Sequence, residues 1–293
     1  MKSWLLKSIF VFSALLFPFT TVSAAVSDSP DETSSVQPLS KAHAHNDYWH
    51  DRPLLDALEN GFTSVEADVW LQDGDLFVAH DREEIESGRT LKSLYLNPLA
   101  EITKNNKGPV FAEYDQDFLL WIDIKSEDEA TYRELHEQLR NYQNMLTKFV
   151  PSGVKRGSVT VIVSGNRPRD LMESQTVRYA TYDGRMSDLG SDASNEFISV
   201  ISDNWNNHFS WNGEGEMPKA EQEKLHRIVS TAHENGRIVR FWATPDSRSE
   251  ERKAVWQELL NAGVDLINSD DLSGLQKFLK KNDENPTEPH LNW

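Results

Sequence analysis

The sequence contains no cysteine. An acylated lipoprotein anchor is therefore excluded, because that modification needs a cysteine thiol. Disulfides are excluded as well, so export to an oxidising compartment would bring no covalent stabilisation. The stability of the fold must come from a packed core.

Basic residues are scarce relative to acidic ones. The chain has 30 Lys and Arg against 47 Asp and Glu, a formal net charge of −17. Such a surface repels nucleic acid and anionic lipid, so we expect no nucleic-acid partner. Binding of an anionic substrate would need a local positive charge, such as a metal ion or a lysine. The sequence does not indicate an oligomeric state.

Long apolar runs are also missing, apart from one at the start of the chain. Residues 1–24 have a positive beginning with Lys2 and Lys7, an apolar stretch interrupted by Pro18, and small residues at 22–24. This pattern is typical of a cleaved secretory signal. We therefore expect a bacterial-type secreted or periplasmic protein without stable membrane insertion; a retained N-terminal anchor is the alternative.

The remainder has the length of one large α/β domain. We expect a flexible lead-in at 25–39, the domain at 40–281 and a polar tail at 282–293. No Gly-rich phosphate turn follows the first strand, as it usually does in a doubly wound sheet. Eight apolar runs alternating with helical patterns instead predict a (β/α)8 TIM barrel. The predicted strands are 41–45, 63–70, 118–125, 158–164, 178–182, 197–202, 237–243 and 264–268.

Capping signals mark several of the intervening helices. Proline is favoured at the first helical position, glycine just after the last, and Ser-x-x-Glu forms a capping box. The predicted boundaries are Pro53 to Gly61, Ser126 with Glu129, Pro218 to Gly236, and Ser247 with Glu250 leading to Gly263.

Charged residues interrupt two strands that should be buried on both faces. In "SVEADVW", Glu66 and Asp68 share one side, and in "FLLWIDIK", Asp123 and Lys125 do. They must point to the barrel axis, since facing the helices would desolvate them. Late in their strands, they should meet at the C-terminal mouth. Three hard oxygen ligands without cysteine or a second histidine favour Mg²⁺ or Ca²⁺. Pairing with Lys125 and nearby arginines alone remains an alternative.

Histidines cluster in "KAHAHNDYWHD", residues 41–51, and another lies in "LFVAHD". The second, His80, should return to the mouth on the loop after the second strand. Histidine suits acid/base work because its ordinary pKa lies near working pH. We predict His43 and His80 as catalytic and leave open whether His45 takes the place of His43. His50 is interpreted as a bystander.

Several motifs resemble the glycerophosphodiester phosphodiesterases. "AHAHNDY…GFTSVEADVWLQDGDLFVAHD" is similar to that family's AHR, G-x-x-x-x-E-x-D-V, D-G and V-x-x-H-D pattern, and "LLWIDIK", "GRIVRFWATPD" and "AGVDLINSDDL" resemble its later strands. The variant "HAHNDY", with "DIKS", "SGNRPR", "DGR" and "SDNW", looks like the bacterial branch near the altered-inheritance-of-mitochondria-6 proteins, within the phospholipase-C-like phosphodiesterase superfamily.

The resemblance spans about residues 41–275 and implies a barrel that cleaves a glycerophosphodiester or phospholipid-type substrate. It implies Glu66, Asp68 and Asp123 as ligands of a divalent cation, His43 and His80 as the acid/base pair, and Lys125 as a phosphate contact. Water or a substrate hydroxyl could be the nucleophile.

This chain departs from the family pattern in three places. Ala44 follows the first histidine where the family has arginine, so Arg185 or Asn46 could replace that phosphate contact. The interval to His80 is one residue shorter, which a tight Asp73-Gly74 turn could absorb. Asp123 stands where the family has glutamate. The predicted substrate-binding residues are His45, Asn46, Lys125, Arg185 and Trp242.

Two alternatives belong to other functional classes. His43-x-His45 also fits the first-strand metal motif of amidohydrolase-type barrels, although no histidine ends the fifth or sixth strand. A non-catalytic binding barrel could use Trp205 and Trp211, with Trp242, to hold a sugar or glycerol moiety. The same loop could equally be a lid in which these tryptophans only pack against the protein and bind no ligand.

Overall fold

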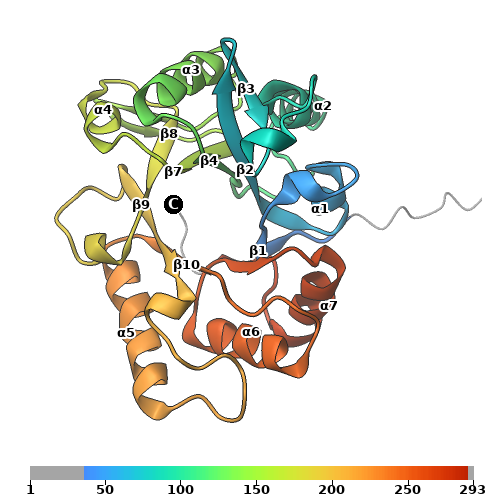
Figure 1. The fold of residues 1–293 in the computed structure, drawn as a ribbon, viewed down its shortest axis with the longest axis vertical. Helices are drawn as coiled ribbons and strands as arrows, with labels where there is room; N and C mark the ends of the chain where they lie inside the picture. The colour runs from blue at the N-terminus through green and yellow to red at the C-terminus, as the bar shows by residue number, and fades with distance from the viewer. Residues whose placement is uncertain (1–35, 290–293) are drawn as a thin grey trace, which may run out of the picture. The chain divides into compact units, whose positions relative to one another are not determined.

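The computed structural model describes residues 36–289, which form a closed barrel of eight parallel strands (Figure 1). Seven neighbouring pairs are hydrogen-bonded in the order β10-β9-β8-β7-β4-β2-β1-β11. A parallel bridge between Arg240 and Leu266 joins the two ends and closes the ring. The predicted (β/α)8 architecture is confirmed.

All eight barrel strands lie where the apolar runs predicted them, within a few residues. Their bounds are β1 Leu39–Ala44, β2 Phe62–Gln72, β4 Phe118–Ile124, β7 Val159–Gly165, β8 Ala180–Gly184, β9 Ile198–Asn204, β10 Ile238–Trp242 and β11 Ile267–Ser269. Two further hairpin elements lie outside the ring. These are β3, Asp75–Val78, which pairs with β2, and the β5–β6 hairpin, Lys148–Val150 with Gly153–Lys155.

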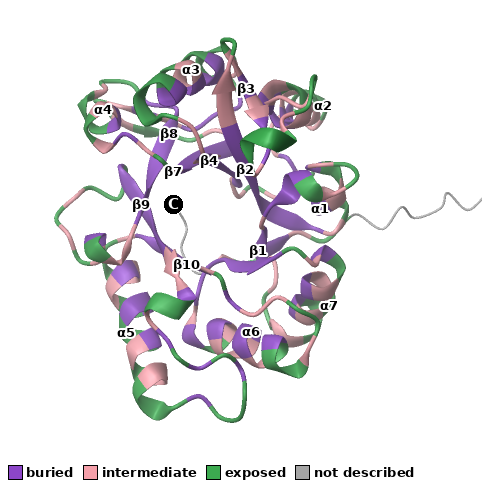
Figure 2. Cartoon of the chain, in the orientation of Figure 1, coloured by how far each residue is buried: buried purple, intermediate pink, exposed green. Residues whose placement is uncertain are grey.

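Helices surround the strands (Figure 1), and their outward faces carry most of the exposed residues (Figure 2). The strands contribute almost entirely buried residues, as expected of a parallel sheet covered by helices. The helix bounds are α1 Leu55–Glu59, α2 Asn97–Asn105, α3 Asp128–Asn141, α4 Arg169–Ser174, α5 Lys219–Glu234, α6 Glu250–Ala262 and α7 Leu272–Asn282.

Two predicted capping boxes are wrong in detail. Helix α3 is capped by the Glu127 side chain, which accepts from the Ala130 N–H, while Ser126 accepts from the Leu71 N–H. Helix α6 is capped by Ser249 rather than Ser247. In both places another oxygen lies closer to the first free N–H groups, so it takes the capping role.

The barrel interior is filled in layers along its axis. An inner apolar cluster comprises Leu119, Trp121, Ile162, Val200, Ile238 and Leu266. It separates polar groups at the C-terminal mouth from a second set at the N-terminal mouth. The barrel is therefore a packed core with two chemically distinct ends.

The segment predicted as a polar tail contacts the N-terminal end of β1 in the part that is described, 282–289. The ammonium of Lys41, only 3% exposed, donates to the Asp283 carboxylate at 2.8 Å and to the carbonyls of Asn285 and Glu288. Ser40 N donates to the Pro286 carbonyl at 2.8 Å. This strap, residues 283–288, anchors the chain across the base of β1.

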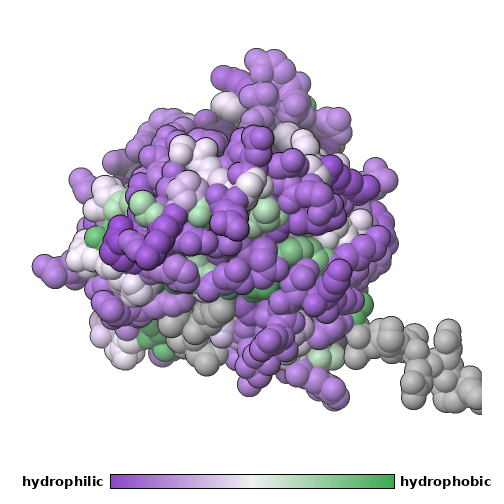
Figure 3. Space-filling view, turned by 90° about the horizontal axis from the view of Figure 1, so that it is seen from below, coloured by the Kyte–Doolittle hydropathy of each residue, from purple (hydrophilic) through white to green (hydrophobic). Residues whose placement is uncertain are grey.

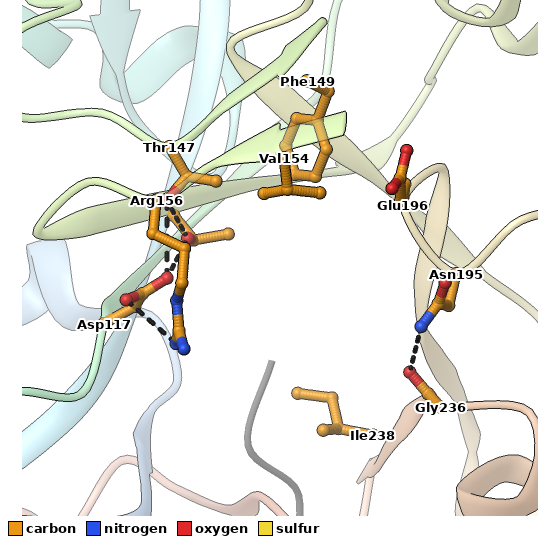
Figure 4. Close-up of a pocket in the computed structure, with 10 residues that line it drawn as sticks. Asp117, Thr147, Phe149, Val154, Arg156, Asn195, Glu196, Gly236 and Ile238 are labelled. Atoms are coloured by element: carbon orange, nitrogen blue, oxygen red, sulfur yellow. Dashed lines mark hydrogen bonds and ion pairs between the residues drawn. The ribbon is translucent and has the colours of Figure 1, made fainter. Parts of the chain in front are cut away.

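A pocket of about 320 Å³ opens beside this end of the barrel. Figure 4 shows Phe149 and Val154 from the β5–β6 hairpin facing Asn195 and Glu196 across it. Its lining residues precede or begin strands of the barrel ring. The pocket therefore lies at the end opposite the one where barrel active sites form.

The face in Figure 3 is mainly hydrophilic, with apolar residues in small groups, in keeping with the charge of −17. Within 36–289, no helix has the length and apolarity needed to cross a bilayer. The predicted signal at 1–24 and most of the lead-in at 25–39 lie outside the described residues.

Candidate active site

Three carboxylates converge at the C-terminal mouth. Each of Glu66, Asp68 and Asp123 presents a carboxylate oxygen such that the three oxygens lie within 4.8 Å of one another. The strand register explains this, because Asp68 of β2 pairs directly with Asp123 of β4, and Glu66 lies one step deeper on the same side. Sequence periodicity therefore placed these three correctly relative to each other.

Glu66 is bonded to a buried arginine, Arg240, that was not among the predicted site residues. Its Oε2 lies 2.5 Å from Arg240 Nη2 and 3.1 Å from His43 Nε2. Arg240 also donates to the Asn268 carboxamide oxygen and stacks over Trp121, 4.6 Å from the ring centroid. Burial would raise the pKa of Glu66, but the charge of Arg240, together with the hydrogen bond and charges of the nearby histidines, keeps that pKa well below its ordinary value.

Asp68 is 1% exposed, and its two oxygens differ in their contacts. Oδ2 lies 2.7 Å from the Tyr48 hydroxyl, 3.0 Å from His80 Nδ1 and 3.0 Å from Lys125 Nζ. Oδ1 is buried and has no hydrogen-bond partner among the described residues. Burial and the nearby Glu66 charge raise the pKa of Asp68. A buried oxygen left without a donor is suited to a cation.

Asp123 shares Lys125 with Asp68, its Oδ1 lying 3.2 Å from the ammonium. Burial and the charge of Glu66 raise the pKa of Asp123 to about 6. Gly165 lies against this carboxylate with φ +67°, and a Cβ there would come within 2.3 Å of Asp123 Oδ1. Glycine at this position therefore gives the carboxylate its space. The predicted pairing with Lys125 exists, but one ammonium faces two carboxylates.

A hairpin brings His80 back to the mouth. Asp73 and Gly74, with φ of 51° and 79°, form the two-residue turn between β2 and β3, a conformation that Asp-Gly favours. His80 then lies beside Asp68, with its side chain 43% exposed and its ring 5.6 Å from that of Trp49. The predicted return of His80, and the tight turn that permits it, match the structure.

His43 does not reach the mouth. It is completely buried, with Nδ1 2.7 Å from Ser64 Oγ and Nε2 bonded to Glu66. Burial, followed by the charge of Arg240, lowers the pKa of His43 to about 3. A neutral ring enclosed by Ser64, Glu66 and Trp121 cannot touch a substrate, which argues against the predicted catalytic role of His43.

His45, one step beyond the end of β1, lies at the mouth instead. Its Nδ1 is 2.7 Å from Asp270 Oδ1, and its side chain is 30% exposed. Burial would lower the pKa of His45, but the hydrogen bond to Asp270, together with the charges of Glu66 and Asp270, raises it. The next residue, Asn46, has φ 47°, a left-handed conformation that asparagine tolerates. The histidine at the mouth is therefore His45, and the Ala-His-Arg pattern of the resembling family corresponds to Ala44-His45-Asn46. Asn46, rather than Ala44, stands where that family has arginine.

Arg185, directly after β8, and Trp242, the last residue of β10, lie on the opposite wall. The Arg185 guanidinium is bonded to the buried carboxylate of Asp183 and lies 3.1 Å from Ser202 Oγ. Its side chain is 26% exposed. Trp242 ends β10 and is half-buried, two residues beyond Arg240 on the same side of the strand. Lys125 and Arg185 thus supply positive charge on two sides of an acidic mouth.

These residues fit a divalent cation. Oxygen ligands from three carboxylates, one of them buried and unpartnered, are the donors that Mg²⁺ and Ca²⁺ prefer. Within 36–289, this is the one group of three or more potential metal ligands, and it contains no histidine. The amidohydrolase alternative required the His-x-His pair in the metal cluster, so the geometry disfavours it.

The tryptophans proposed for a binding module have other partners. Trp205 is fully buried, stacks on Phe209, and donates from Nε1 to the Trp211 carbonyl at 2.9 Å. Trp211 is 7% exposed. These two tryptophans are therefore packed in the core and do not form a sugar-binding surface; of the three, only Trp242 is half-buried at the mouth.

Four residues of the site were missed: Tyr48, Ser64, Arg240 and Asp270. Arg240 had a usable signal, because it is a charge in the middle of an apolar strand, "RIVRFWA", on the same side as Trp242. The argument that placed Glu66 on the barrel axis applies to it unchanged. Tyr48 lies in a short 3-10 helix, Asp47–Trp49, and Asp270 in the bend after β11, and periodicity does not predict the contacts of such connections.

Family models and curated relatives both match this chain. Residues 30–183, over half of the chain, match the AIM6-like phosphodiesterase domain, and residues 239–273 match the glycerophosphoryl diester phosphodiesterase family. An altered inheritance of mitochondria protein 6 homolog from Arthroderma benhamiae is 30% identical, with 95% of this chain and all of the relative aligned. The corresponding Eremothecium gossypii protein is 32% identical over 84% of this chain and 71% of its own length. The chain therefore belongs to the AIM6-like phosphodiesterase family, as the sequence motifs predicted.

A glycerophosphoryl diester phosphodiesterase from Parabacteroides distasonis is a structural neighbour at a TM-score of 0.47 and 12% identity, covering 84% of this chain and 87% of that one. The barrel described above does not depend on this likeness.

The predicted bacterial-type secreted or periplasmic localisation is wrong. The curated relatives are altered-inheritance-of-mitochondria proteins of fungi and yeasts, including Saccharomyces cerevisiae at 27% identity. The prediction depended on the composition of residues 1–24 alone, and an apolar N-terminal run with flanking lysines is not specific to one kind of export.

Proposed function

We propose that this protein is a phosphoric diester hydrolase that uses a divalent cation and two histidines to cleave a small-molecule or lipid phosphodiester. The observation that carries this proposal is the juxtaposition of Asp68 with His80, Lys125 and a free buried oxygen at the mouth. Phosphate binding, charge stabilisation and proton transfer need such groups within a few ångströms of each other.

Glu66, Asp68 and Asp123 would hold the cation. When bound, it would attract the phosphate oxygens and stabilise the negative charge that develops on them. Lys125 and Arg185 face the same space and would contact the phosphate. Asn46 is neutral and cannot supply the charge of the family's arginine. Lys125 and Arg185 would therefore supply the positive charge that the phosphate needs.

We assign the acid/base pair to His45 and His80 rather than to His43 and His80. With Nδ1 of His45 held by Asp270, its other nitrogen is directed away from that contact; His80 is held in the same way by Asp68. One histidine takes the proton of the attacking hydroxyl as its oxygen bonds to phosphorus. The other protonates the leaving oxygen as the phosphorus–oxygen bond breaks. His43 acts through Glu66 as a positioning residue.

Hydrolysis of bis-p-nitrophenyl phosphate tests the proposal. We expect turnover with Mg²⁺ or Ca²⁺ and its loss after chelation. His45→Ala and His80→Ala should each lower kcat about 10²- to 10⁴-fold, the usual contribution of general acid/base catalysis. A folded protein that cleaves no phosphodiester with any divalent ion would refute the function. Full activity of His45→Ala, with His43→Ala inactive but folded, would restore the original pair.

A further inference from the structure

The three carboxylates of the mouth share a feature that bears on the cation they select. In each of them one oxygen is bonded to protein cations or donors. Glu66 Oε2 is bonded to Arg240 and His43, Asp68 Oδ2 to Tyr48, His80 and Lys125, and Asp123 Oδ1 to Lys125. Each side chain therefore has one remaining oxygen.

Arg240 makes this restriction permanent at Glu66. Its side chain is 3% exposed, its guanidinium is fixed by two hydrogen bonds to Asn268 Oδ1, and Trp121 covers its face. A guanidinium stays charged at all working pH values and cannot easily leave such an enclosure. Glu66 Oε2 faces Arg240 at 2.5 Å and is therefore not available to a second cation.

The number of free oxygens distinguishes the two candidate ions. Ca²⁺ takes six to eight oxygens and commonly uses carboxylates with both oxygens, whereas Mg²⁺ takes six in a strict octahedron, retains water and uses single carboxylate oxygens. Three carboxylates with one oxygen each supply half of an octahedron and leave the other half to water and phosphate. The same three are a poor start for a seven- or eight-oxygen shell.

We propose that Arg240 is a selectivity residue that limits Glu66 to one ligand oxygen, so that the site binds Mg²⁺ in preference to Ca²⁺. This inference depends on the proposed divalent-cation site and adds the identity of the ion. Arg240 acts through Glu66 and does not touch substrate.

Binding of each ion alone, measured by titration calorimetry of the full chain without substrate, tests the proposal. For the wild-type protein we expect Mg²⁺ to bind at least about threefold more tightly than Ca²⁺. Arg240→Met removes the charged partner of Glu66 Oε2 and leaves only the hydrogen bond with His43. In this variant the ratio should move toward Ca²⁺ by about tenfold, or 1.4 kcal/mol. Circular dichroism would verify that the variant is folded.

Arg185→Met is the matched control. It removes the same charge from the same mouth, but its partner is Asp183 and it contacts none of the three ligands. Loss of a nearby positive charge should strengthen the binding of both ions similarly and leave their ratio within about twofold.

Tighter binding of Ca²⁺ by the wild-type protein would overturn the proposal whatever the variants do, and so would equal shifts in the two variants. If Arg240→Met does not fold, Arg240→Gln, which can still donate to Asn268, replaces it. Preference for Ca²⁺ with intact phosphodiester turnover would refute the selectivity alone. Absence of any ion binding together with absence of turnover would refute the proposed function.

Discussion

The two ends of the barrel bury aspartates in different ways. At the N-terminal end, both oxygens of Asp117 are partnered, Oδ2 by Thr160 at 2.7 Å and Oδ1 by Arg156 at 3.2 Å. At the C-terminal end, Asp68 has three contacts on one oxygen and none on the other. Both side chains are buried, so burial does not separate them.

The two aspartates differ in whether both of their carboxylate oxygens have a hydrogen-bond partner. A carboxylate whose oxygens are all partnered is stabilised as it stands and has no capacity left for a ligand. A buried oxygen without a donor costs free energy of folding unless something occupies it. The N-terminal end therefore behaves as scaffold, although it has the pocket of about 320 Å³, and the C-terminal end as site.

Substitution of Asp68 should have the largest effect on turnover. Asp68→Asn removes a charged ligand and places an amide among the donors of His80 and Lys125. We expect kcat/KM for a phosphodiester to fall about 10³-fold, or 4 kcal/mol in transition-state stabilisation. Steady-state kinetics with saturating Mg²⁺ measure it, and a fall of less than tenfold would contradict the assignment of this carboxylate.

Asp117→Asn is the corresponding change at the other end. It breaks the ion pair with Arg156 and should lower the free energy of unfolding by about 1–2 kcal/mol. Turnover per folded molecule should stay within about twofold of wild type. Urea unfolding and kinetics on the same preparation measure both quantities. A large loss of turnover would show that the two ends are coupled.

The strap of residues 283–288 should matter for stability alone. Lys41→Met leaves the Asp283 carboxylate, 8% exposed, without its ammonium partner. Removing one member of a buried pair costs about 3 kcal/mol, which should appear as a lower urea midpoint. Lys41→Met combined with Asp283→Asn should recover part of the loss. If the single variant unfolds at the wild-type midpoint, the strap contributes nothing.

The last expected effect concerns pH. The pKa of His43 is about 3 in the folded protein, against an ordinary 6.5, so the unfolded chain binds this proton first. Stability should therefore fall as pH drops below 6.5 toward 3. Between pH 7 and 4.5 this histidine should account for about 2.5 kcal/mol of lost stability.

His43→Gln keeps a polar side chain between Ser64 and Glu66 but has no titrating group. Urea unfolding at both pH values should show a smaller loss in this variant than in the wild type. Equal losses in the two proteins would mean that His43 titrates normally and is not enclosed as described.

The sequence was sufficient for the ring of strands and for the inward direction of several side chains. Alternation places Glu66, Asp68 and Asp123 on the axis because a charge cannot face the helix layer. The return of His80 followed from the Asp73-Gly74 turn. Helix starts were less predictable, since Ser126 and Ser247 compete with neighbouring oxygens for the same N–H groups.

The period-2 pattern of the strand could not tell whether His43 or His45 reaches the C-terminal mouth. Both lie on one side of the strand, so both point inward. Their depth along the axis depends on the stagger of β1 against β2, in which His43 pairs with Ser64, below Glu66. Stagger is set by closure of the whole barrel, a property of eight strands together.

By itself, then, the sequence determined that this chain forms a (β/α)8 barrel of the phosphodiesterase type with acids, histidines and a lysine at one end. Hydrophobic alternation and turn residues are local, and local patterns are sufficient for that much. Only the tertiary structure decided which histidine reaches the mouth and which oxygen of each carboxylate is free. Those depend on contacts such as Arg240 with Glu66, between residues 174 positions apart in the chain.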